Sequence, residues 1–127
     1  MTEVRPKPCQ ACPYRKDVPS GVWASDEYDK LRSFDLPTAE QPFNGFACHS
    51  TPQMYCNGWA IVHTSRGHEY DLISLRFSPC EIPAPVVELF DSGNAAADHG
   101  QREIEAPSTE ALAKIEVLER QIARRTR

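Results

Sequence analysis

The clearest periodic pattern in the chain lies near its C-terminus. Ala111, Ile115, Leu118 and Ile122 repeat at intervals of four, three and four residues, the spacing of one helix face. Ser108 precedes this run and can cap the helix. The pattern predicts an amphipathic helix over 108–127. Because it spans only about two heptads, it needs a partner surface, and we expect it to serve association, including formation of a homo-oligomer.

A second helix is predicted to begin at Ser25, a residue type that caps helix N-termini. Tyr28, Leu31 and Phe34 then fall on roughly one face. Pro37 ends this helix, and residues 37–47 are expected to form a loop with a short extended piece at its end.

A third helix is predicted from Thr51-Pro52, with threonine as the cap and proline at the first helical position. Tyr55 and Trp59 follow at helical spacing, and the run ends between residues 63 and 67. Gly58 weakens the pattern, because glycine costs about 1 kcal/mol inside a helix.

The remaining segments are less regular. Prolines make residues 1–22 loop-rich, while a helix is favoured over 68–77 and short helical turns over Val86–Phe90 and Ala95–His99. The sequence predicts a mainly α fold, a small, irregular, metal-stapled domain with a C-terminal amphipathic helix. We divide it into a four-cysteine domain (1–90), a linker (91–107) and the terminal helix (108–127).

Charge and hydropathy limit the function classes. The formal net charge is −4, so a globally basic nucleic-acid binder is not indicated. No apolar run approaches the roughly 20 residues of a membrane-spanning helix. Residues 1–8 carry no hydrophobic signal-peptide core. We therefore expect a cytoplasmic protein that is not bound to a membrane.

The cysteines carry the candidate chemistry. In a reducing compartment, clustered cysteines indicate metal binding or catalysis more often than disulfides. Cys9 and Cys12 form a C-x-x-C pair, and Cys48 and Cys56 supply a second pair. Four thiolates define a closed, structural zinc site, so all four are predicted to ligate Zn²⁺. His49 is the obvious substitute ligand.

Two other uses of these thiols remain open. A [4Fe–4S] cluster, acting in redox chemistry or regulation, also takes four thiolates, and Cys12-Pro13 is a dipeptide found at such clusters. A thiol oxidoreductase would use Cys9 and Cys12, but the surrounding prolines leave no strand–helix frame for it. The fifth cysteine, Cys80, is a reserve ligand.

No arrangement of residues indicates a catalytic site, so none is assigned. The chain lacks a phosphate-binding loop, a dinucleotide fingerprint and an H-E-x-x-H motif. Binding to a protein or a nucleic acid is therefore the expected role, and positions 120, 124, 125 and 127 place four arginines at the C-terminus. Arg15 and Lys16 are expected to offset the negative charge of a four-thiolate site.

The segment from Cys9 to Phe77 resembles an uncharacterised family of small proteins from high-GC Gram-positive bacteria and their phages. The resemblance rests on C-x2-C-P-Y-R-K-D-x-P from Cys9, on F-x-C-H from Phe46, and on C-x-G-W from Cys56. It implies a shared site containing the four proposed ligands and supplies no activity. The C-terminal helix lies outside the resemblance.

Overall fold

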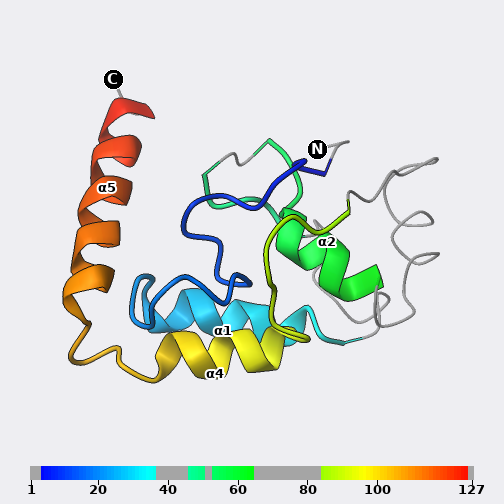
Figure 1. Cartoon of the computed structure of the whole chain (residues 1–127), viewed down its shortest axis with the longest axis horizontal. Helices are drawn as coiled ribbons and strands as arrows, with labels where there is room; N and C mark the ends of the chain where they lie inside the picture. Colours follow the sequence, from blue (N-terminus) through cyan, green and yellow to red (C-terminus); the bar gives the residue numbers. More distant parts are fainter. Residues whose placement is uncertain (1–3, 37–45, 51–52, 65–83, 126–127) are drawn as a thin grey trace.

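The computed structural model describes residues 4–36, 46–50, 53–64 and 84–125. Over these residues it contains four helices, α1 (Ser25–Ser33), α2 (Asn57–His63), α4 (Gly93–Gln101) and α5 (Thr109–Arg125) (Figure 1). Strand pairing in the same residues is limited to isolated bridges. The expectation of a mainly helical fold is therefore confirmed. None of these four helices is long and apolar enough to cross a membrane.

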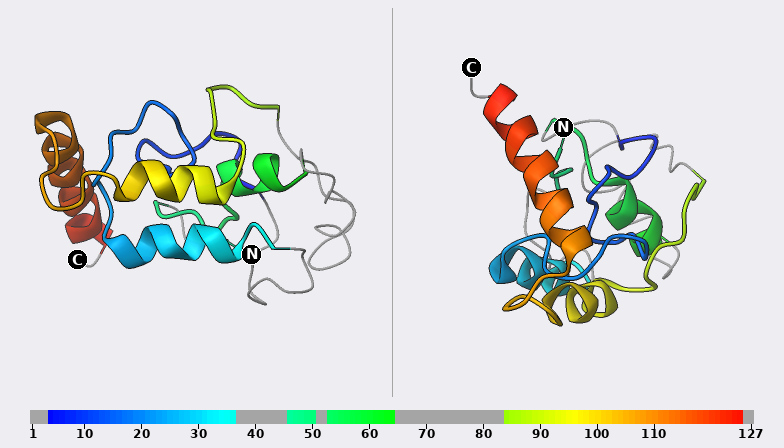
Figure 2. Two further views of the ribbon diagram at one scale, coloured as in Figure 1. Left: turned by 90° about the horizontal axis from the view of Figure 1, so that it is seen from below. Right: turned by 60° about the vertical axis from the view of Figure 1, so that its left-hand side comes forward.

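Helices α1 and α4 lie side by side and form one layer of the molecule (Figures 1 and 2). The predicted apolar face of α1 is buried, with Tyr28 at 2% and Leu31 at 0% exposure. Ala96 on α4 is also fully buried. A side chain at Gly100 would collide with the ring of Tyr28, so glycine is needed at this position for the two helices to approach.

The segment 91–107, expected to be a linker, contains helix α4, whose N-terminus is held against the end of α1. The Asp35 carboxylate accepts hydrogen bonds from the Gly93 and Asn94 amides, both at 2.6 Å, and the Ser92 hydroxyl accepts one from Ala95. These contacts cap the helix N-terminus. The shorter helix predicted over Ala95–His99 is confirmed within α4.

Helix α2 begins later than predicted. Its N-cap is Cys56, whereas a start at Thr51-Pro52 had placed this cysteine inside the helix. The residues before it are held in extended pairing instead, because Tyr55 forms bridges with Val4 and Ala47. Thr51 and Pro52 lie outside the described residues, as do the helix favoured over 68–77 and Cys80.

The helical turn predicted over Val86–Phe90 is also wrong. This segment pairs with the N-terminal loop, where the Lys16 amide donates to the Glu88 carbonyl at 3.1 Å and the Phe90 amide donates to the Tyr14 carbonyl at 2.9 Å. These bonds pair Leu89 with Arg15 in an isolated antiparallel bridge, so the backbone there is extended rather than helical.

Helix α5 begins after Ser108, whose hydroxyl accepts a hydrogen bond from the Ala111 amide at 3.1 Å. Ala111 and Leu118 are buried against the N-terminal segment, at 0% and 7% exposure. The C-terminal end of the helix extends away from the rest of the molecule (Figures 1 and 2), and Ile122 is 44% exposed. The predicted helix is confirmed, and the first half of its apolar face is docked on its own chain.

Candidate metal centre

The four cysteines of the predicted site are all buried and come from two distant parts of the chain. Cys9 and Cys12 lie on the N-terminal loop, while Cys48 and Cys56 flank the extended segment before α2; none is more than 3% exposed. The Sγ atoms of Cys12 and Cys56 are 3.8 Å apart. The fold therefore brings one thiol of each pair into direct contact.

The Cys9 thiol connects the remaining cysteine to this pair. Cys9 interacts with the thiols of Cys12 and Cys48. The pKa of Cys9 is raised, first by the neighbouring Cys12 thiol and also by burial. The pKa of Cys12 is raised well above its usual range, first by the Cys56 thiol and also by burial. Packed together in this way, the thiols of Cys9 and Cys12 are neutral at pH 7.

The four thiols form a series of pairwise contacts, Cys48 to Cys9 to Cys12 to Cys56, rather than a finished coordination sphere. Among the residues that the structure describes, no group of three or more Cys, His, Asp or Glu side chains is arranged to hold a metal ion. A shared ion would require the side chains to turn toward a common centre. The donor set itself, four buried sulfurs, matches the chemistry of a thiophilic ion.

The C-x-x-C segment is a tight turn. The Cys12 amide donates to the Cys9 carbonyl at 3.1 Å, and the Arg15 amide donates to the Cys12 carbonyl at 3.0 Å. The Arg15 guanidinium also donates to the Cys9 carbonyl at 3.3 Å. The carbonyl groups of both cysteines, at the two ends of the turn, therefore accept hydrogen bonds.

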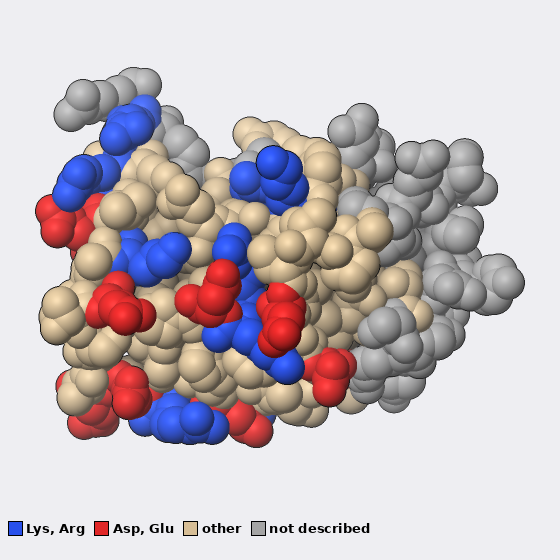
Figure 3. All heavy atoms as spheres, viewed as in Figure 1, with Lys and Arg blue, Asp and Glu red and all other residues tan. Residues whose placement is uncertain are grey.

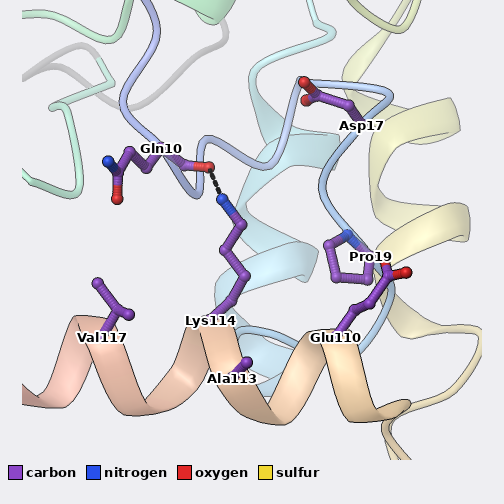
Figure 4. Close-up of a pocket in the computed structure, with 7 residues that line it drawn as sticks. All are labelled: Gln10, Asp17, Pro19, Glu110, Ala113, Lys114 and Val117. Atoms are coloured by element: carbon purple, nitrogen blue, oxygen red, sulfur yellow. Dashed lines mark hydrogen bonds between the residues drawn. The ribbon is translucent and has the colours of Figure 1, made fainter.

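The two residues between these cysteines are held by side chains from elsewhere in the chain. The Trp23 indole donates to the Ala11 carbonyl at 2.7 Å. The Lys114 ammonium, on α5, donates to the Gln10 carbonyl at 3.1 Å (Figure 4). Every carbonyl from Cys9 to Cys12 therefore accepts a hydrogen bond, which fixes the turn that presents the two thiols.

The second pair of cysteines is positioned by a short hairpin-like pairing. The Cys48 amide donates to the Met54 carbonyl at 2.9 Å, and the Cys56 amide donates to the Phe46 carbonyl at 2.8 Å. The sulfur of Cys56 accepts a hydrogen bond from the Trp59 amide at 3.5 Å. Because an amide N–H stabilises a thiolate, this contact suits a ligand that must lose its proton.

Gly58 allows the two halves of the site to meet. A Cβ atom at this position would lie 2.6 Å from Cβ of Tyr14 and 3.1 Å from the sulfur of Cys12. The first turn of α2 can approach the N-terminal loop only without that atom. From the sequence, Gly58 appeared only to destabilise the predicted helix. The close packing of Gly58 against Tyr14 and Cys12 was not predicted.

Two arginines lie next to the thiols. The Arg5 guanidinium donates to the sulfur of Cys48 at 3.4 Å. Arg15 pairs with both carboxylate oxygens of Asp17 at 2.8 Å. The pKa of Arg15 is raised, first by this pairing with Asp17. Arg15 was predicted to lie near the site, whereas Arg5, in a segment that appeared featureless, was missed.

Lys16 and His49 have other partners. The Lys16 ammonium lies 4.0 Å from the Glu88 carboxylate. Nε2 of His49 lies 3.3 Å from the Glu27 carboxylate, and its ring packs on Trp23 at a centroid distance of 4.5 Å. Burial lowers the pKa of His49. The polar contact and the ring contact thus hold the His49 ring against Glu27 and Trp23.

The fold and the site define a small, mainly helical protein with a buried cluster of four cysteines. The chain belongs to the family described as "Family of unknown function (DUF6283)", which it matches over residues 4–122. The match includes most of α5, so the expectation that the resemblance ends at Phe77 was wrong. No curated protein and no solved structure matched the chain.

Proposed function

We propose that this protein binds one structural zinc ion through Cys9, Cys12, Cys48 and Cys56. The observation that carries the proposal is the distance of 3.8 Å between the Sγ atoms of Cys12 and Cys56, which lie 44 residues apart in the sequence. Four buried sulfurs in pairwise contact supply the donor set of a closed four-thiolate sphere, which is a common structural zinc site.

The same distance is compatible with a single shared ion. With Zn–S bonds of about 2.3 Å, two sulfurs at neighbouring corners of a tetrahedron lie about 3.8 Å apart. This agrees with the separation of 3.8 Å between Cys12 and Cys56. A [4Fe–4S] cluster binds each thiolate on a different iron atom, so its ligand sulfurs stand farther apart.

The surroundings of the thiols suit a site of net negative charge. Four thiolates around Zn²⁺ carry a net charge of −2, and the guanidinium groups of Arg5 and Arg15 lie beside them. The raised pKa values of Cys9 and Cys12 describe the protonated thiols, and zinc would displace these protons on binding.

A thiol oxidoreductase is less well supported by the same observations. Such an enzyme needs an accessible thiolate with a lowered pKa. Cys9 and Cys12 are 3% and 1% exposed. Their pKa values are raised, so both the access and the reactivity that this chemistry needs are lacking.

The role of the stapled domain is proposed to be binding to another protein. On the face seen in Figure 3, lysine and arginine side chains alternate with aspartate and glutamate, and no broad basic surface is visible for nucleic acid. Helix α5 also exposes apolar side chains, with Leu112 at 55% and Ile122 at 44% exposure. Such side chains are suited to protein contacts.

The test is metal analysis of protein purified without oxygen, combined with an absorption spectrum. We expect a colourless protein that contains one equivalent of zinc. Cys12→Ser should lose the metal, and Cys80→Ser, at the fifth cysteine, should retain it. Absorption near about 400 nm would indicate the cluster instead. Folded protein without metal would overturn the proposal.

A further inference from the structure

Helix α5 contacts the C-x-x-C turn through a polar and an apolar interaction. The Lys114 ammonium donates to the Gln10 carbonyl at 3.1 Å (Figure 4). One turn away on each side, Ala111 and Leu118 pack in the same buried cluster as Ala11, which is 0% exposed. The C-terminal helix thus bonds to Gln10 and shares a buried apolar cluster with Ala11, the two residues that separate Cys9 from Cys12.

The same buried cluster includes Val18 and Val22 of the N-terminal segment, so α5 docks along one strip of its surface. A groove of about 360 Å³ separates the helix from the N-terminal loop, with Ala113 and Val117 on one side and Asp17 and Pro19 on the other (Figure 4). Val117 remains 39% exposed. A helix held along a narrow strip can leave its docking surface at a lower cost than one embedded in a core.

We propose that α5 regulates metal retention at the cysteine cluster, because its docking holds the Cys9–Cys12 turn in the shape that presents both thiols. This inference rests on the proposed zinc site. When α5 leaves the N-terminal segment, Gln10 loses its hydrogen bond and Ala11 loses its apolar cover. The turn then becomes more mobile, and the ion dissociates more readily.

Thermodynamic linkage makes the effect reciprocal. The factor by which docking of α5 tightens zinc binding must equal the factor by which zinc favours docking. A partner that binds the undocked helix would therefore promote zinc release. Addition of zinc would in turn oppose that partner.

The polar contact is tested with the full-length protein, by competition for zinc with a coloured chelator. Lys114→Met keeps the length of the side chain but removes the donor, and we expect zinc affinity to fall about three- to tenfold. Arg120→Met is the matched control. It removes a cation of the same helix that pairs with Glu116 at 2.6 Å, away from the turn, and zinc affinity should not change.

The apolar contact is tested with a second matched pair of variants. Leu118→Ala removes buried side-chain volume at the docking strip, and we expect zinc affinity to fall at least tenfold. Ile122→Ala makes a similar change on the same helix face, where the side chain is 44% exposed, and should leave the affinity within about twofold. Circular dichroism verifies that all four variants retain their helices.

Limited trypsin digestion supplies the reciprocal measurement. Arg102, between α4 and α5, is exposed, and we expect removal of zinc to accelerate cleavage there. If the wild-type protein binds no zinc, the proposed function fails. If it binds zinc but the Lys114 and Leu118 variants behave like their controls, the zinc site stands and the role of α5 is refuted.

Discussion

The helix pair, α1 and α4, and the cysteine-bearing region, residues 4–15 together with 46–50 and 53–64, are held together by different means. The helix pair has a buried apolar face, a capped N-terminus on α4, and polar contacts such as Arg32 to Asp98 at 2.9 Å and to Gln101 at 2.8 Å. The cysteine-bearing region consists mainly of turns and isolated bridges.

The difference also appears in how well buried polar groups are satisfied. Within the described residues, three buried side-chain atoms have no hydrogen-bond partner, and they belong to His49, Asn57 and Trp59. All three residues lie in the cysteine-bearing region. Unpaired buried polar atoms are costly, so this region gains less from its own hydrogen bonds than the helix pair does. A bound ion would stabilise the cysteine-bearing region where its own hydrogen bonds do not.

The largest effect is expected from removing one proposed zinc ligand, because only the cysteine-bearing region should depend on the ion. Cys12→Ser should abolish stoichiometric zinc binding and lower the free energy of unfolding by about 3 kcal/mol or more, because metal binding contributes to folding. Thermal unfolding with and without added zinc measures this effect. If the variant melts like the wild-type protein and retains its metal, the cysteine-bearing region does not depend on an ion.

The second effect concerns the helix pair alone. Gly100→Ala introduces a methyl group against the buried ring of Tyr28, and we expect a loss of about 2 kcal/mol because the core is overpacked. Denaturant unfolding measures the loss, and zinc content should stay at one equivalent. Loss of zinc in this variant would show that the two regions are not separable.

A smaller effect is expected beside the thiols. Arg5→Met removes the donor to the sulfur of Cys48 and one positive charge, so zinc affinity should fall about three- to tenfold. Chelator competition measures it. Lys7→Met, which removes an exposed charge two residues away, serves as the control and should leave the affinity unchanged.

The smallest effect concerns pH. Pairing with Arg15 lowers the pKa of Asp17 below its usual value of 3.8, so the pair stabilises the fold above that pH and loses its effect as pH falls through the lowered pKa. Because Asp17 is exposed, we expect Asp17→Asn to cost about 0.5 kcal/mol or less at pH 7. The difference between the urea midpoints of the variant and the wild-type protein should be smaller at pH 3 than at pH 7; an unchanged difference would contradict the role of this pair.

The parts of the fold that were predictable from sequence depend on local periodicity. The buried face of α1, with Tyr28 and Leu31, follows from helical spacing, and so does the docked face of α5, with Ala111 and Leu118. In both helices, apolar residues recur at helical spacing, so the buried face can be predicted without knowing which residues it contacts.

The parts that were missed depend on contacts between distant segments. Tyr55 is extended because it pairs with Val4, so the helix that its spacing suggested begins only after Cys56. Helix α4 has alanine and glycine where a helix usually shows large apolar side chains, and its burial follows from close approach to α1. Arg5 gains its position beside Cys48 through the same distant pairing.

The cysteine spacing did suggest that the two pairs meet, but it could not give the order of contacts among the thiols. That order follows from the Cys9–Cys12 turn, from the pairing around Cys48, and from the close approach allowed by Gly58. These are tertiary features, and a C-x-x-C motif alone specifies only the first of them.

The central claim is that the four buried sulfurs share one zinc ion. X-ray absorption at the zinc edge of the purified protein tests it most directly. The account predicts a single shell of four sulfur atoms at about 2.3 Å, without nitrogen or oxygen ligands. A shell containing nitrogen or oxygen, or a sample without zinc, would contradict it.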